Sequence, residues 1–146
     1  MRPVRSAAVA LLGLVGCARG PAPTPVLPST VLENEQVRRT MSAALDADAA
    51  GTPADSLYLI GAIVIANGLP VSTSPRFASV RPGGGVSLSG ATVEVTAYLA
   101  WGVLDYQWTP RTRGTPVYGR ATFVLERAGG SWRIKHLHSS AVSGPA

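Results

Sequence analysis

Residues 119–140 read GRATFVLERAGGSWRIKHLHSS, two runs of alternating apolar and polar residues joined by Gly129-Gly130. Two adjacent glycines accept the positive φ angles of a two-residue β-hairpin turn at no steric cost. The turn sets Glu126 opposite Arg133, and we expect an ion pair between them on an exposed face. The sequence therefore predicts an antiparallel hairpin with one polar and one apolar face.

Continued away from the turn, this register places Phe123 opposite His136 and Ala121 opposite His138. The apolar face is then a wall that ends in two imidazoles: Ala121, Phe123, Leu125, Trp132, Ile134, His136 and His138. The same alternation in the preceding strand adds three residues to this wall, namely Leu104, Tyr106 and Trp108. It leaves Asp105 on the opposite face.

Upstream of the sheet, residues 30–50 are predicted to form an amphipathic helix. Thr30 and Glu33 fit a capping box, and Gly51 ends the helix. Its buried side is predicted to carry Val37, Met41, Ala44 and Leu45. Asp46 and Asp48 lie in the last turn, where the helix dipole disfavours anions. Either both are simply solvated or one of them has another role.

A second cap, Thr52-Pro53-Ala54-Asp55, predicts a short helix ending near Leu59. Beyond it, β-branched and aromatic residues punctuated by glycine and proline predict a sheet. The expected strands cover residues 62–66, 86–89, 92–105 or beyond, 117–127 and 131–140. Together these elements indicate an α+β fold with the helices first.

The N-terminus has the pattern of a secretory signal, with Arg2 and Arg5 before an apolar run that is too short to span a bilayer. That run closes with Leu14-Val15-Gly16-Cys17, which resembles the lipobox of bacterial lipoproteins. The resemblance implies a signal peptide over residues 1–16 and a lipid-modified Cys17, with diacylglycerol or palmitate chains as the membrane anchor. The alternative is an incidental thiol after an ordinary cleaved signal.

A proline-rich tether is predicted over residues 17–29, because proline favours extended backbone. With a lipid on Cys17, this arrangement places the protein in the bacterial cell envelope, facing the periplasm or the exterior. The 146-residue chain carries a formal charge of +5, and cleavage before Cys17 would remove Arg2 and Arg5 from it. So small and scattered a charge argues against nucleic acid as a partner. The single cysteine excludes an internal disulfide.

The order of elements and the ending Trp132-Arg133-Ile134-Lys135-His136-Leu137-His138-Ser139-Ser140 resemble the nuclear transport factor 2-like superfamily, and in particular its SnoaL-like members. The resemblance covers residues 30–140 and leaves 141–146 as a flexible tail. It implies N-terminal helices packed in the concave face of a strongly curved antiparallel sheet, the cone-shaped, cystatin-like architecture. A pocket would lie between helix and sheet. The ending is also similar to a kinase association domain that forms dimers, whose pocket arginine is replaced here by Phe123.

Members of this superfamily include isomerases, dehydratases, binding modules and oligomerisation domains, so the fold does not decide the activity. Our leading hypothesis is non-catalytic binding of a small, largely apolar molecule, with a homodimer formed through the sheet. The residues predicted to line its pocket are Tyr58, Leu104, Tyr106, Trp108, Phe123, His136 and His138.

Two alternatives stay open. An isomerase or cyclase would use His136 or His138 as its base and Tyr106 as the donor to a developing oxyanion. A purely structural dimerisation domain would have the pocket filled by its own side chains. Metal binding by the two histidines lacks a third ligand on the same wall, and neither a metal nor another cofactor is expected.

Overall fold

The structure is a computed structural model that describes residues 30–144. The predicted signal peptide, the lipidation at Cys17 and the tether therefore lie outside the described residues, as do the last two residues of the predicted tail. No helix within the described part of the chain is long and apolar enough to cross a membrane.

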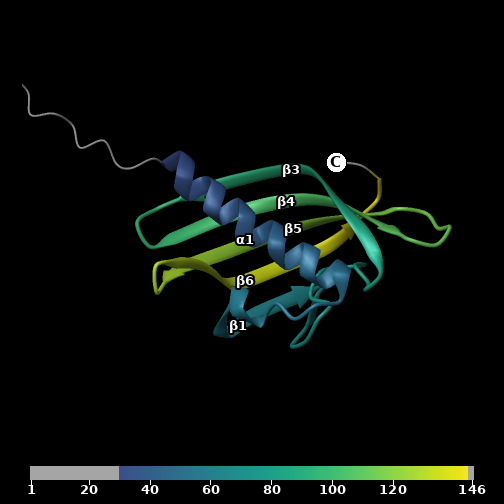
Figure 1. The fold of residues 1–146 in the computed structure, drawn as a ribbon, viewed down its shortest axis with the longest axis horizontal. Coiled ribbons are helices and arrows are strands. Elements are labelled where there is room, and N and C mark those ends of the chain that lie inside the picture. The colour runs from purple at the N-terminus through teal and green to yellow at the C-terminus, as the bar shows by residue number, and fades with distance from the viewer. Residues whose placement is uncertain (1–29, 145–146) are drawn as a thin grey trace, which may run out of the picture.

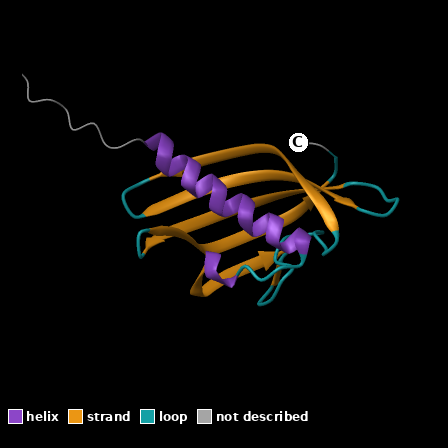
Figure 2. Ribbon diagram, in the orientation of Figure 1, coloured by secondary structure: helices purple, strands orange, loops and turns teal. Residues whose placement is uncertain are grey.

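One α-helix lies across the face of a single curved sheet (Figures 1 and 2). The elements are α1 (Thr30–Ala50), the 3₁₀ helix η1 (Asp55–Leu57), β1 (Tyr58–Ala66), β2 (Leu69–Pro70), β3 (Gly84–Val95), β4 (Leu99–Pro110), β5 (Val117–Ala128) and β6 (Ser131–Val142). The strand order is β2-β1-β6-β5-β4-β3. The predicted fold class is confirmed.

Two details differ from the prediction. The second helix is the single 3₁₀ turn η1, because the chain already enters β1 at Tyr58. The sheet is also not wholly antiparallel, since β1 pairs in parallel with β6. Nearly the whole sheet separates these two strands along the chain, which allows the long connection that a parallel pair requires. Strand β6 continues to Val142, two residues past the predicted end of the domain.

The strand predicted over residues 92–105 is wrong, because the chain turns between β3 and β4 at Thr96–Tyr98. The Thr96 hydroxyl donates to the Leu99 carbonyl at 2.7 Å and accepts the Leu99 N–H at 3.2 Å. The backbone N–H of Thr96 also donates to the Leu99 carbonyl, at 2.8 Å. A threonine side chain thus closes this turn. The turn contains no glycine, proline or asparagine, the residues that usually indicate a turn in a sequence.

The β5–β6 hairpin confirms the predicted turn and the first pairs beyond it. Gly129 and Gly130 have φ of 58° and 80°, and Glu126 pairs with Arg133 in the ladder. The predicted ion pair between these two residues is wrong, however. Glu126 binds Lys135 instead, at 2.5 Å, because Lys135 projects from the same face of β6.

Farther from the turn, a β-bulge overturns the predicted register. Leu125 still pairs with Ile134, but Val124 pairs with His136, so Lys135 is an extra residue on β6. The side chains beyond it change faces, because alternation along a strand has a period of two. Phe123 is therefore opposite Leu137 rather than His136, and Ala121 is opposite Ser139 rather than His138.

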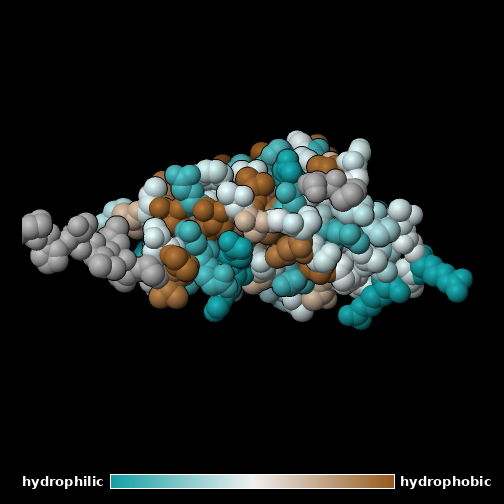
Figure 3. Space-filling model, turned by 90° about the horizontal axis from the view of Figure 1, so that it is seen from above, coloured by the Kyte–Doolittle hydropathy of each residue, from teal (hydrophilic) through white to brown (hydrophobic). Residues whose placement is uncertain are grey.

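The core lies between α1 and the concave face of the sheet. The four helix residues predicted to face it are fully buried: Val37, Met41, Ala44 and Leu45. Phe77 and Val80 join them from the long connection between β2 and β3, residues 71–83. The β4–β5 loop extends from one end of the sheet (Figure 1) and exposes Arg111 and Arg113, and that end of the molecule is hydrophilic in Figure 3.

Asp48 anchors the 71–83 connection to the end of α1. Its side chain is buried, and its Oδ2 accepts the backbone N–H groups of Arg76 and Phe77, the latter at 3.0 Å. Of the two alternatives left open by the sequence, the structure therefore supports a further role for one aspartate of the last helical turn. Asp46, by contrast, is exposed.

Three side chains of the sheet hold the next residues of the same connection. Ser139 accepts the Ala78 N–H at 2.9 Å, and Tyr106 donates its hydroxyl proton to the Ala78 carbonyl at 2.8 Å. The indole N–H of Trp108 donates to the carbonyl of Arg81 at 3.0 Å. Helix and sheet thus fix a segment that has no regular structure of its own.

We predict that Asp48→Ala lowers the free energy of unfolding by about 2–4 kcal/mol, because it leaves two buried backbone N–H groups without an acceptor. Asp46→Ala is the matched control, since it removes the same side chain from the same helical turn at an exposed position. It should change stability by less than about 0.5 kcal/mol. Urea unfolding of both variants measures the difference, and equal effects would contradict the anchoring role.

Candidate functional site

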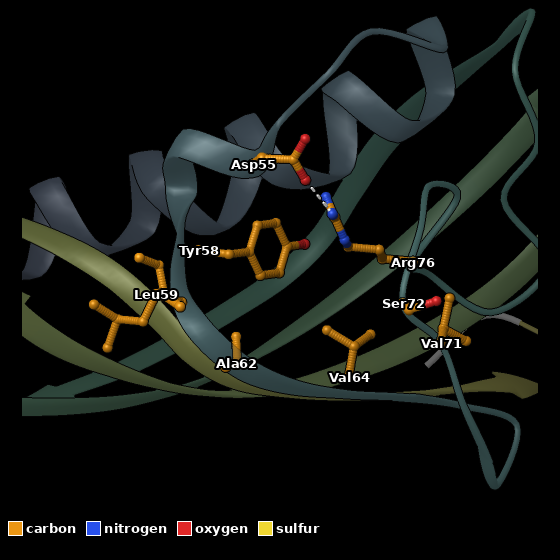
Figure 4. A pocket seen from close by; sticks show the side chains of 10 residues that line it. Asp55, Tyr58, Leu59, Ala62, Val64, Val71, Ser72 and Arg76 are labelled. Atoms are coloured by element: carbon orange, nitrogen blue, oxygen red, sulfur yellow. Dashed lines mark hydrogen bonds and ion pairs between the residues drawn. The ribbon is translucent and has the colours of Figure 1, made fainter.

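A hollow of about 320 Å³ opens at the edge of the sheet, between β1, η1 and the start of the 71–83 connection (Figure 4). Its apolar walls are built by side chains that include Ala62, Val64 and Val71. Tyr58 and Arg76 supply its buried polar groups, and Asp55 lies at its rim.

Arg76 is buried although it carries a charge, with only 7 % of its surface exposed. Its Nη2 pairs with the carboxylate of Asp55, and the guanidinium carbon lies 4.4 Å from the centre of the Tyr58 ring. A guanidinium over an aromatic face is a favourable contact when water is excluded. The second terminal nitrogen, Nη1, is buried without a hydrogen-bond partner among the described residues.

The Tyr58 side chain turns its hydroxyl toward Arg76 (Figure 4), and that oxygen is likewise buried, without a hydrogen bond of standard geometry to any residue within 30–144. Burial raises the pKa of the phenol well above its ordinary value, and the carboxylate of Asp48 raises it further. The charge of Arg76 and its polar side-chain contact with the phenol act in the opposite direction but do not cancel the rise of the pKa. Tyr58 therefore stays protonated at neutral pH and can donate a hydrogen bond.

Two buried donors without a hydrogen bond of standard geometry thus belong to residues that line one small hollow with apolar walls. Arg76 Nη1 and the Tyr58 hydroxyl could both bind one acceptor oxygen, such as a carbonyl. The charge of Arg76 is already balanced by Asp55, whose own side chain is 78 % exposed. A neutral polar end therefore fits the hollow better than a second full negative charge would.

Among the residues predicted to line a pocket, Tyr58 does line this hollow. Leu104, Tyr106 and Phe123 lie instead in the packed core, where they are 0–1 % exposed. The Phe77 ring fills the space beside them, with its centre 5.8 Å from the ring centres of both Tyr106 and Phe123. The 71–83 connection thus fills the space beside Tyr106 and Phe123, where the interior pocket is expected. Trp108 closes the same core nearby, at 9 % exposure.

The predicted pairing of Tyr106 with His136 or His138 is not assembled. The bulge at Lys135 sends both imidazoles to the convex face, while the Tyr106 hydroxyl donates to the Ala78 carbonyl inside. Burial also raises the pKa of Tyr106. In this structure Tyr106 supports the connection rather than facing a hollow.

Asp105 lies on the convex face, as predicted, and binds Arg120 through both of its carboxylate oxygens, at 2.6 and 3.2 Å. Within the described residues, no group of three or more histidine, cysteine, aspartate or glutamate side chains could hold a metal ion.

The sequence did not identify Arg76 or Asp55 as members of the site. Asp48 had one usable signal, its unfavourable place in the last turn of a helix. Arg76 follows Pro75 in a segment with no periodicity, so the residues themselves do not indicate that its side chain turns inward. Its burial depends on contacts with residues 21 and 28 positions away.

The convex face of the sheet carries a row of side chains that runs across five strands. Trp101 pairs with Val124, Val124 with His136, and His136 with Ile63, while Glu94 continues the row on β3. Trp101 is 44 % exposed and Ile63 is 60 % exposed. Apolar surface is therefore open to solvent on the side of the sheet opposite α1.

Residues 71–144 match the family described as the SnoaL-like domain. No curated protein matches the chain. Among solved structures, the fold is similar to a nuclear transport factor 2-like protein of unknown function from Pseudomonas putida, with 18 % identity, a TM-score of 0.60, and coverage of 77 % of this chain and 89 % of that one.

The fold is also similar to a putative ketosteroid isomerase from Parabacteroides distasonis, at 15 % identity and a TM-score of 0.60, covering 82 % of this chain and 94 % of that chain. A protein of unknown function with a cystatin-like fold from Nostoc punctiforme has 10 % identity and a TM-score of 0.63, covering 80 % of this chain and 96 % of that one. At these identities the likeness shows the fold alone.

Proposed function

This chain belongs to the family of SnoaL-like domains, and from that premise we propose that it binds a small molecule, without transforming it, in the hollow beside Tyr58 and Arg76. One observation carries the proposal: two buried donors that lack a hydrogen bond of standard geometry among the described residues belong to side chains lining a hollow of about 320 Å³ with apolar walls. Buried polar groups are normally hydrogen-bonded, so an acceptor from a ligand would complete both.

The same geometry argues for binding rather than catalysis. Proton abstraction needs a base of suitable pKa within reach of the substrate. The only carboxylate in the lining of this hollow is Asp55, and it is paired with Arg76. Tyr58 stays protonated, so it can hold an oxygen atom but cannot accept a proton from carbon. We infer a ligand with one neutral oxygen acceptor and a compact apolar body.

Filling the hollow should abolish binding without unfolding the protein. Ala62 lines the hollow, and Ala62→Leu would occupy space that the ligand needs. Native mass spectrometry of the full chain, purified from cells that naturally produce it, should show a bound mass that is lost on activation. That mass should be absent from Ala62→Leu.

The matched control is Ser87→Leu, which adds a similar apolar side chain at an exposed position on β3. It should retain the bound mass. If both variants retain it, or if the unaltered chain carries nothing, the hollow is not the binding site that we propose.

We also propose that the domain is held at a membrane of the bacterial cell envelope by lipid on Cys17, and faces the periplasm or the exterior. The support is the sequence of residues 1–29 alone. Cys17→Ser should abolish incorporation of labelled palmitate, because a serine cannot form the thioether that attaches the diacylglycerol. An equal palmitate signal in Cys17→Ser would reject the anchor.

Finally, we propose a homodimer formed through the convex face, where the row containing Trp101 exposes apolar surface. Trp101→Glu should convert a dimer into a monomer in light scattering, since it places a second carboxylate beside Glu94 in the interface. Leu88→Glu is the control, because Leu88 is equally exposed, at 44 %, but is in register with the buried Tyr106. A monomeric unaltered chain would contradict the proposal.

A further inference from the structure

A second hollow, of about 440 Å³, lies between α1, η1 and the β5–β6 hairpin. It shares none of its lining residues with the first hollow. Arg39 and Arg133 line it, together with Trp132 and the hydroxyl-bearing residues Thr40, Ser56 and Ser131. The lining therefore contains two cationic side chains and no carboxylate.

Arg133 makes no ion pair within the described part of the chain, and it also lines a neighbouring hollow together with Glu126 and Lys135. Its cross-strand neighbour is Glu126, but the carboxylate of Glu126 is bound by Lys135 at 2.5 Å. Arg39 has an ion pair with Glu35 at 3.0 Å, and both side chains are largely exposed, at 77 % and 47 %. A pair this exposed contributes little and exchanges readily. Arg39 and Arg133 can therefore both contribute positive charge to a ligand in this hollow.

One residue of the lining also has a buried donor without a partner. Trp132 is 4 % exposed, and its indole N–H has no hydrogen-bond partner among the described residues. Arg127 lies over the face of the same indole, with its guanidinium carbon 5.7 Å from the centre of the ring. An indole nitrogen can only donate, so the group that completes it must be an acceptor.

From these observations we propose that this hollow binds a phosphate group. Guanidinium groups match the geometry and charge of phosphate oxygens, and hydroxyl and indole donors add neutral hydrogen bonds. The first hollow differs because Asp55 balances its only arginine. The proposal therefore stands independently of the function proposed above.

The phosphate could belong to a soluble ester or to a lipid headgroup, because the chemistry at the hollow is the same. If Cys17 carries lipid, residues 17–29 would separate the domain from the bilayer by some tens of ångströms at most, at about 3 Å per residue. Anionic headgroups would then be within reach of the hollow.

The test uses the full chain in a nonionic detergent and follows the indole N–H resonance of Trp132 by NMR, assigned from the spectrum of Trp132→Phe. Inorganic phosphate should shift this resonance in a saturable manner, and sodium chloride at equal ionic strength should not. Arg133→Gln should weaken phosphate binding by about tenfold or more, because it removes a charge-assisted contact.

Arg38→Gln is the matched control. It removes the same charge from an exposed position on α1 that does not line the hollow, and it should leave the affinity within about twofold. The proposal fails if phosphate causes no saturable shift, or if both variants weaken binding equally, which would indicate general screening.

A second arm distinguishes the two sources of phosphate. The full chain is placed in bilayer discs of phosphatidylglycerol or of phosphatidylcholine. A shift in phosphatidylglycerol discs that free phosphate reverses assigns the hollow to a headgroup. A shift caused by free phosphate alone, in either disc, assigns it to a soluble ester. Either result supports a phosphate site.

Discussion

The attachment of residues 76–77 to Asp48 is the contact on which the interior of this domain depends. A connection of thirteen residues without regular structure would normally lie on the surface, because its backbone polar groups need water. Asp48 accepts two of its N–H groups at the end of α1, and Ser139, Tyr106 and Trp108 bind the backbone that follows. With these groups satisfied, the connection can carry Phe77 into the core.

That attachment also determines where a ligand can bind. Phe77 occupies the space beside Tyr106 and Phe123, so the concave side of the sheet is packed at the level where a cone-shaped fold is expected to be hollow. The same attachment turns Arg76, one residue earlier, toward Tyr58 and Asp55 at the sheet edge. Filling the interior and building the edge hollow are therefore two results of one set of contacts.

Sequence patterns predicted those features of the fold that depend on residues close together along the chain. The helix, its buried stripe at Val37 and Met41, and the hairpin at Gly129 all follow from periodicity or turn chemistry, and all are confirmed. The bulge at Lys135 could not be predicted, because an inserted residue leaves the alternation of types intact while reversing the faces beyond it. The burial of the Arg76 side chain could not be predicted either, since its partners are distant in sequence.

The two hollows differ because a neighbouring carboxylate neutralises the arginine in one of them and not in the other. Arg76 has Asp55 as a direct partner, so its hollow carries little net charge and favours a neutral acceptor. Arg133 loses its expected partner Glu126 to Lys135. Lys135 is the bulged residue that also moves the histidines to the convex face. A single inserted residue in β6 thus separates Tyr106 from its predicted base and leaves Arg133 available to bind an anion.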